Sequence, residues 1–134
     1  MLLRILVSAC VALLVASCGA PETLPPDVTV TVELRDYSVR VTPATVKAGA
    51  QKIGIRNAAG MVHEFELIRT DLAPDKLPVE DAKAKLDGLV KQVLNIAPGK
   101  VAVVNADLAP GHYVVICDVA GHYQLGMHAE LRVE

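Results

Sequence analysis

Apolar and polar residues alternate in short segments along most of this chain, and this period of two constrains the fold more than any other feature. The first segment carries apolar side chains at every second position: Val28, Val30, Val32 and Leu34. Successive side chains of a strand point to opposite faces of a sheet, so the pattern predicts strands with one buried face. Further strands are expected at residues 52–57, 62–70, 101–108, 112–117 and 127–133, with turn residues between them. Many short strands separated by turns predict an all-β sandwich or barrel.

Two places depart from this alternation. Its phase changes near Asp36, because the next apolar residues are Val39 and Val41, and we expect a bend or a bulge there. Residues 78–91, PVEDAKAKLDGLVK, instead combine helix-forming residues with acidic residues in the first turn. They predict a short surface helix inserted between two strands.

Composition argues against several classes of protein. With 134 residues, the chain has the length of a single domain. Hydrophobic residues make up 52% and charged residues 21%, which argues against a disordered chain. One Phe, three Tyr and no Trp are present, so the core must be mainly aliphatic. The net charge is -2 and no basic cluster stands out, so we expect no nucleic-acid partner.

The first 17 residues have the pattern of a signal peptide. They carry one charge, Arg4, before the apolar run 5–15. That run is shorter than the roughly 20 residues that a membrane-spanning helix needs, so we expect residues 1–17 to be removed after export. A retained anchor is an alternative.

The end of this segment, Val-Ala-Ser-Cys18, resembles a bacterial lipobox, in which the cysteine becomes the acylated first residue. We therefore expect lipid on Cys18, a Pro-rich tether over residues 18–27, and a folded domain over residues 28–134. The protein would then lie on the periplasmic or cell-surface side of a bacterial membrane, anchored through Cys18. A plain cleaved signal without lipid is the other alternative.

Cys117 would have no disulfide partner in such a lipoprotein, because Cys18 is the only other cysteine left after cleavage. An unpaired thiol in an oxidising compartment requires a reactive, metal-bound or well-buried role. Cys117, His122 and Met127 follow one another at equal spacings of five residues, and their side chains are candidate ligands for a soft or borderline metal. Strand parity points Cys117 and Met127 into the core, and turns ending in Gly121 and Gly126 can fold His122 back over the end of the sandwich.

His63 is the fourth candidate ligand. It alternates with Phe65 and Leu67, so it is expected to face inward, whereas Glu64 and Glu66 are expected to face water. Two imidazoles and a thiolate with a distant thioether form the donor set of blue copper sites, whereas Met is a poor ligand for zinc. The sequence therefore predicts a single copper ion and electron transfer.

With these residues the chain resembles the cupredoxin family of type 1 blue copper proteins. The matching features are the Asn-containing turn from Asn57 to His63, the Pro110-Gly111 entry into the cysteine strand, and the C-x4-H-x4-M loop, whose spacing is similar to that of rusticyanin and sulfocyanin. The resemblance implies a Greek-key β-sandwich with one type 1 copper ion. It also implies the ligand set: His63, Cys117, His122 and Met127. The chain departs from many family members by placing an acidic residue after two of the ligands, Glu64 and Asp118.

These features predict an exported, membrane-tethered monomer that passes single electrons between redox proteins by transient contact. Electrons would leave through the edge of His122, surrounded by an apolar patch of Ala120, Leu125 and Met61. Four protein ligands leave no open position for a substrate, so we expect no enzymatic activity. The alternative is a protein that buffers copper or delivers it to an oxidase, which requires exposed, Met-rich ligands, yet only three Met are present. His112 and His128 are expected to lie outside the site.

Overall fold

The computed structural model describes residues 22–134, so the predicted signal peptide and the lipid site Cys18 lie outside the described residues. Over this range the chain forms strands and no helix. The strands are β1 (Val30–Arg35), β2 (Ser38–Thr42), β3 (Thr45–Val46), β4 (Gly49–Asn57), β5 (His63–Arg69), β6 (Val79–Glu80), β7 (Lys83–Ala84), β8 (Leu89–Ile96), β9 (Val101–Leu108), β10 (Gly111–Ile116) and β11 (His128–Val133). Within residues 22–134, no helix is long and apolar enough to cross a membrane.

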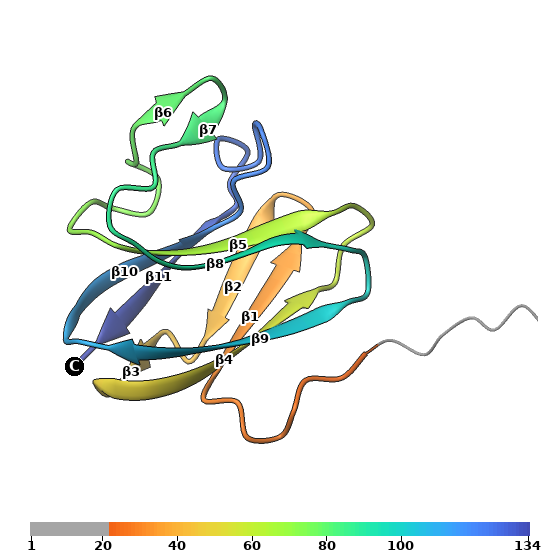
Figure 1. Ribbon diagram of the computed structural model, residues 1–134. Helices are drawn as coiled ribbons and strands as arrows, with labels where there is room; N and C mark the ends of the chain where they lie inside the picture. Colours follow the sequence, from red (N-terminus) through yellow and green to blue (C-terminus); the bar gives the residue numbers. More distant parts are fainter. Residues whose placement is uncertain (1–21) are drawn as a thin grey trace, which may run out of the picture.

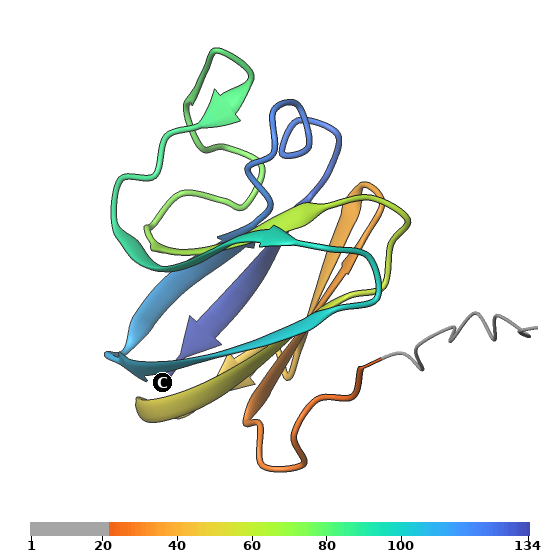
Figure 2. The same cartoon turned by 45° about the vertical axis from the view of Figure 1, so that its right-hand side comes forward.

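Two sheets face each other and enclose the core (Figures 1 and 2). One has the strand order β2-β1-β4-β9 and the other the order β3-β11-β10-β5-β8. Most neighbours are antiparallel, but β1 pairs with β4 in parallel and β11 pairs with β3 in parallel. The predicted all-β Greek-key sandwich is thus confirmed, with mixed sheets.

The core between the sheets is aliphatic, as the composition predicts. The first sheet contributes Val30, Val32, Leu34, Ile53 and Ile55, and the second contributes Phe65, Leu67, Val115, Leu131 and Val133. All of these side chains are at most 3% exposed. Cys117 and Met127 belong to the same cluster, at the end of the sandwich where β10 ends and β11 begins. The ligand strands are therefore held by the main hydrophobic core.

The predicted helix at residues 78–91 is wrong. These residues form the hairpin of β6 and β7 and the start of β8, and Asp81 and Ala82 take positive φ angles of 50° and 63° in the hairpin turn. The amide of Ala84 donates to Asp118 Oδ1 at 2.7 Å, and the amide of Gly121 donates to Ala82 O at 2.8 Å. A short isolated helix is marginal in water, so these contacts with the loop between β10 and β11 outweigh helix propensity.

The change of phase near Asp36 is a hairpin turn. Asp36 and Tyr37 connect β1 to β2, with Arg35 opposite Ser38, and Tyr37 has a φ of 63°. This turn lies at the same end of the sandwich as the loop between β10 and β11 (Figure 1).

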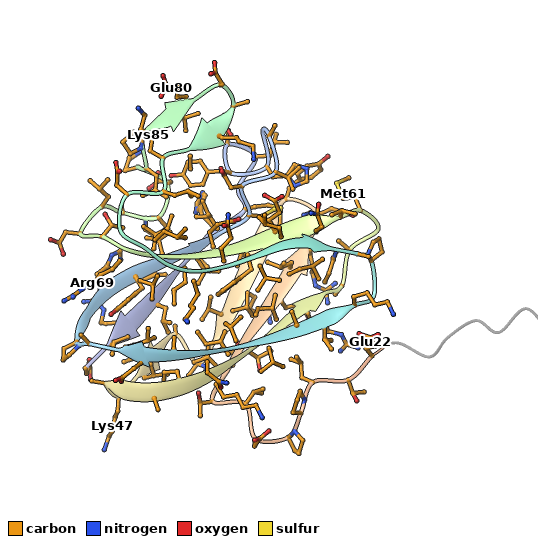
Figure 3. All side chains as sticks on the ribbon, viewed as in Figure 1. Glu22, Lys47, Met61, Arg69, Glu80 and Lys85 are labelled. Atoms are coloured by element: carbon orange, nitrogen blue, oxygen red, sulfur yellow. The ribbon has the colours of Figure 1, made fainter. Side chains whose placement is uncertain are left out.

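Part of the predicted tether lies against the first sheet. Glu22 accepts hydrogen bonds from Lys100 Nζ at 2.7 Å and from the amide of Val101 at 3.2 Å (Figure 3). The side chains of Leu24 and Val28 lie so close to Gly54 that a Cβ atom there would be 2.8 Å from Leu24 Cδ2. From Glu22 onward, the segment is therefore attached to the domain.

Candidate metal centre

Three separate segments bring together three predicted ligands. His63 begins β5, Cys117 follows β10, and His122 lies in the turn before β11. His63 Nδ1 lies 3.2 Å from His122 Nδ1, and Cys117 Sγ lies 3.6 Å from His63 Nδ1 and 3.7 Å from His122 Nδ1. His63 thus meets Cys117 and His122, which lie 54 and 59 positions further along the sequence.

A metal ion fits between these atoms. The centre of a triangle with sides of 3.2, 3.6 and 3.7 Å lies about 2 Å from each corner. Metal–imidazole bonds measure ~2.0–2.1 Å and metal–thiolate bonds ~2.3 Å, so little movement is needed. Within residues 22–134, these three residues form the group of possible metal ligands. A thiolate with two imidazoles suits copper.

Met127 is fully buried in the same core cluster as Cys117. Its carbonyl oxygen accepts a hydrogen bond from the amide of Cys117 at 3.1 Å, and its amide donates to His122 O at 3.1 Å. These bonds attach the residue before β11 to the start and to the middle of the ligand loop. The role of Met127 as a fourth, more distant ligand stays a prediction.

The loop from Cys117 to Met127 is built from tight turns. The amide of His122 donates to Val119 O at 2.8 Å, and the amide of Gly126 donates to Tyr123 O at 3.0 Å. Gly121 and Gly126 have φ angles of 84° and 113°, a region that glycine adopts without strain. The turns therefore bring His122 back toward Cys117, at the end of β10.

Asn57 fixes the loop that precedes His63. Its fully buried amide group donates to Met61 O and to Ile96 O, both at 2.8 Å, and accepts from the amide of Ala59 at 3.0 Å. The single side chain thus ties the end of β4 to β8 and to the residues just before the ligand. A rigid loop limits movement of the imidazole during a redox change.

Burial changes the proton equilibria of the ligands. Burial raises the pKa of the Cys117 thiol, although the amide of Glu64 donates to its sulfur at 3.2 Å and opposes the shift. Burial also lowers the pKa of His63, against the opposing effect of Asp36. His63 is therefore neutral at pH 7 and can act as a ligand. A metal must displace the thiol proton of Cys117, so binding should be coupled to proton release.

Sequence reasoning missed a carboxylate and an aromatic ring beside the two imidazoles. Asp36 Oδ1 lies 3.3 Å from His63 Nε2. The ring of Tyr37 meets that of His122 edge-on, with centroids 5.9 Å apart and an interplanar angle of 75°. The break in alternation near Asp36 marks a turn, but the sequence alone does not show which loops that turn will meet.

The expectation that Glu66 faces water is wrong, because its side chain is 0% exposed. Residues 70–88 cover the outer face of β5 and β10 and enclose a second small core of Ile68, Leu77, Ala84, Val114, Ile116 and Tyr123. Glu66 accepts from Gln92 Nε2 at 3.3 Å and from the amide of Asp118 at 3.1 Å. Burial raises the pKa of Glu66 to about 8, with the charges of Glu64 and Asp118 adding to the effect.

The structure also gives the positions of the remaining residues that the sequence singled out. His112 bonds through Nδ1 to Thr70 O at 2.6 Å, and His128 packs against Tyr123, so neither belongs to the ligand group. His122 is partly exposed, whereas Ala120, Leu125 and Met61 are exposed. Figure 3 shows Met61 at the end of the sandwich near the start of β5.

Comparisons with known proteins agree with this geometry. A family model described as copper binding proteins, plastocyanin/azurin family, matches residues 27–134. Auracyanin from Roseiflexus castenholzii has a similar structure, with a TM-score of 0.58 and 18% identity, covering 78% of this chain and 94% of that chain. Rusticyanin from Thiobacillus ferrooxidans gives a TM-score of 0.59 and 19% identity over 78% of this chain and 76% of that chain. Auracyanin B gives a TM-score of 0.57 and 20% identity, covering 83% of this chain and 93% of that chain. No curated protein sequence matches.

Proposed function

Since the chain belongs to the plastocyanin/azurin family of copper-binding proteins and is a cupredoxin with a single type 1 copper site, we propose that it carries single electrons between redox proteins while tethered to a membrane. Bound copper supplies the one-electron Cu(I)/Cu(II) couple. The observation that supports this role most strongly is the convergence of His63, Cys117 and His122, with ligand atoms 3.2 to 3.7 Å apart.

The protein's own residues suit a site that changes charge with little rearrangement. His63 and Cys117 are fully buried, so water is excluded from most of the centre. Asn57 and the loop turns hold the ligands in place through backbone hydrogen bonds. His122 alone among these three ligands is partly exposed, so its ring edge is the route by which we propose that electrons enter and leave.

Burial of the ligands favours electron transfer over copper delivery. A protein that hands its metal to an oxidase must expose ligands to the acceptor, whereas His63, Cys117 and Met127 are all 0% exposed. Leu125, whose amide donates to His122 O at 3.2 Å, is by contrast 60% exposed. An exposed apolar patch suits brief contact with a redox partner. We propose that Ala120, Leu125 and Met61 form this patch around His122 and that the protein works as a monomer.

A negative charge introduced beside His122 should slow electron exchange. With Ala120→Asp we expect the rate of exchange with a small anionic redox reagent to fall roughly fivefold at low ionic strength, because a charge several ångströms away repels the reagent by about 1 kcal/mol. The rate is measured by stopped-flow absorbance, and the copper spectrum should not change. Ala109→Asp is the matched control, because it adds the same charge to an exposed position before the other end of β10. Equal rates in both variants would exclude His122 as the exit route.

We propose Met127 as the fourth, weaker ligand. Met127→Leu nearly conserves volume, so unfolding free energy should fall by less than about 1.5 kcal/mol. Copper should remain bound, and the reduction potential should rise, because loss of a weak donor disfavours Cu(II) more than Cu(I). Redox titration of the copper-loaded protein measures the change. An unchanged potential would mean that Met127 contributes only packing.

We propose that lipid on Cys18 anchors the domain. Glu22 is bound to Lys100 and Val101, and the chain from Cys18 to Glu22 can span at most about 15 Å, so the domain would stay close to the membrane. Cys18→Ser should move the protein from the membrane fraction to the soluble fraction without changing the copper spectrum. Wild-type protein should stay with membranes at high salt, which removes only electrostatic adhesion. Wild-type protein in the soluble fraction would contradict the anchor.

A further inference from the structure

The hairpin turn of Asp36 and Tyr37 lies beside both histidine ligands. Its position follows from sheet pairing, because β1 pairs with β4 so that Leu34 lies opposite Asn57, and the amide of Ala58 donates to Leu34 O at 2.8 Å. The turn after β1 and the loop before His63 therefore leave the sheet at the same end. On the other side, Gly126 brings the loop so close to the turn that a Cβ atom there would lie 3.1 Å from Tyr37 O.

The carboxylate of Asp36 contacts both the ligand His63 and the loop that precedes it. Oδ1 lies 3.3 Å from Nε2 of His63, and Oδ2 accepts from the amide of Gly60 at 3.4 Å. The Asp36 side chain is 43% exposed, whereas that of His63 is fully buried. An exposed charge thus reaches the inner imidazole through a hydrogen bond.

This contact determines which nitrogen of His63 can bind a metal. An ionised carboxylate only accepts hydrogen bonds, so Nε2 must carry the ring proton. The lone pair is then on Nδ1, which faces Cys117 Sγ at 3.6 Å and His122 Nδ1 at 3.2 Å. Carboxylates that hold the distal nitrogen of a ligating histidine orient the ring and raise its basicity.

We propose that Asp36 is a positioning residue for the copper site, which holds His63 in the Nε2–H tautomer and favours the oxidised state through its charge. This rests on the proposed role as a copper electron carrier. A negative charge stabilises the more positive oxidised centre, so its removal should raise the reduction potential. A carboxylate that served only to close the hairpin turn would leave both the tautomer and the potential unchanged.

The test compares three variants in copper-loaded full-length protein. Asp36→Asn keeps an acceptor oxygen and removes the charge, and Asp36→Ala removes both. Glu33→Gln is the matched control, because Glu33 lies on β1, the strand that leads into this turn, bonds to Arg35 and loses the same charge. We expect Asp36→Asn to shift the Cu(I) to Cu(II) ratio at fixed potential roughly three- to tenfold toward Cu(I), where tenfold corresponds to about 59 mV for one electron. Asp36→Ala should also change the visible spectrum.

A second measurement needs no metal. In metal-free protein with ¹⁵N-labelled histidines, the NMR shifts of His63 should show the Nε2–H tautomer in the wild type and a mixture in Asp36→Ala. A wild-type Nδ1–H tautomer, or a potential in Asp36→Asn equal to that of Glu33→Gln, would overturn the proposal. A wild-type protein without the intense copper–thiolate band would instead contradict the proposed function, so the two failures are distinguishable.

Discussion

Replacing Cys117 by serine is expected to abolish the intense visible absorption of the copper-loaded protein while leaving the sandwich folded. The thiolate supplies the charge-transfer band, and a serine hydroxyl stays protonated and binds copper weakly. Folding depends mainly on the two facing apolar layers, of which Cys117 is one small member. Serine is slightly smaller and can accept the hydrogen bond that the amide of Glu64 gives to the sulfur at 3.2 Å. Burial of the hydroxyl should therefore cost about 1–3 kcal/mol of unfolding free energy.

Absorption spectroscopy and thermal unfolding followed by circular dichroism measure the two parts of this result. Cys18→Ser is the matched control, because it makes the same chemical change at a residue that is not among the proposed ligands, and it should keep the band. An intense band in Cys117→Ser would contradict the assignment of the thiolate. Loss of the folded state in the metal-free variant would mean that Cys117 is needed for folding itself.

The sequence predicts this fold well because the core is built from strict alternation. Val32 and Leu34 on β1, and Phe65 and Leu67 on β5, point inward as their spacing requires. The same rule places His63 and Cys117, since a side chain that shares parity with core residues has no other direction to take. His122 follows from the short loop with two glycines. Periodicity therefore predicts the inward direction of His63 and Cys117 in the same way as it predicts core positions.

The wrong or missing predictions concern residues whose structure depends on contacts with segments far away in the sequence. Residues 78–91 have helix propensity, but the hydrogen bonds from Ala84 to Asp118 and from Gly121 to Ala82 hold them as a hairpin. Glu66 is another case: its parity correctly points it away from the main core, yet it is buried and bonded to Gln92 and to the amide of Asp118. Alternation distinguishes two faces of a strand and does not show whether the outer face is covered. Asp36 was missed for a related reason, because its partner His63 is 27 positions away.

Buried Glu66 should make the stability of the metal-free protein depend on pH. Burial raises its pKa in the folded protein to about 8, compared with an ordinary value of 4.5. Between these values the folded state binds more protons than the unfolded state, so the free energy of unfolding decreases as the pH rises through this window. Each pH unit contributes up to about 1.4 kcal/mol, so the loss from pH 4.5 to pH 8 should amount to a few kcal/mol. Below pH 4.5 the contribution of Glu66 is constant.

Glu66→Gln should remove this dependence, because the amide is uncharged at every pH. Its oxygen can accept from the amide of Asp118, and its nitrogen can donate to Gln92 if the Gln92 amide turns over. Denaturant unfolding should therefore show a variant about as stable as the wild type at pH 4.5 and roughly 2–4 kcal/mol more stable at pH 8. Buried Asp118 and His63 also titrate with shifted pKa values, upward and downward respectively, and both are present in the two proteins. The contribution of His63 cancels in the difference, whereas that of Asp118 cancels only in part, because its charge acts on Glu66. Glu33→Gln, in a surface pair with Arg35, should give no such gain. If the free energy of unfolding changed with pH in the same way in Glu66→Gln and in the wild type, Glu66 would be ionised in the folded protein. The raised pKa would then be wrong, and the two hydrogen bonds would have to stabilise the buried carboxylate.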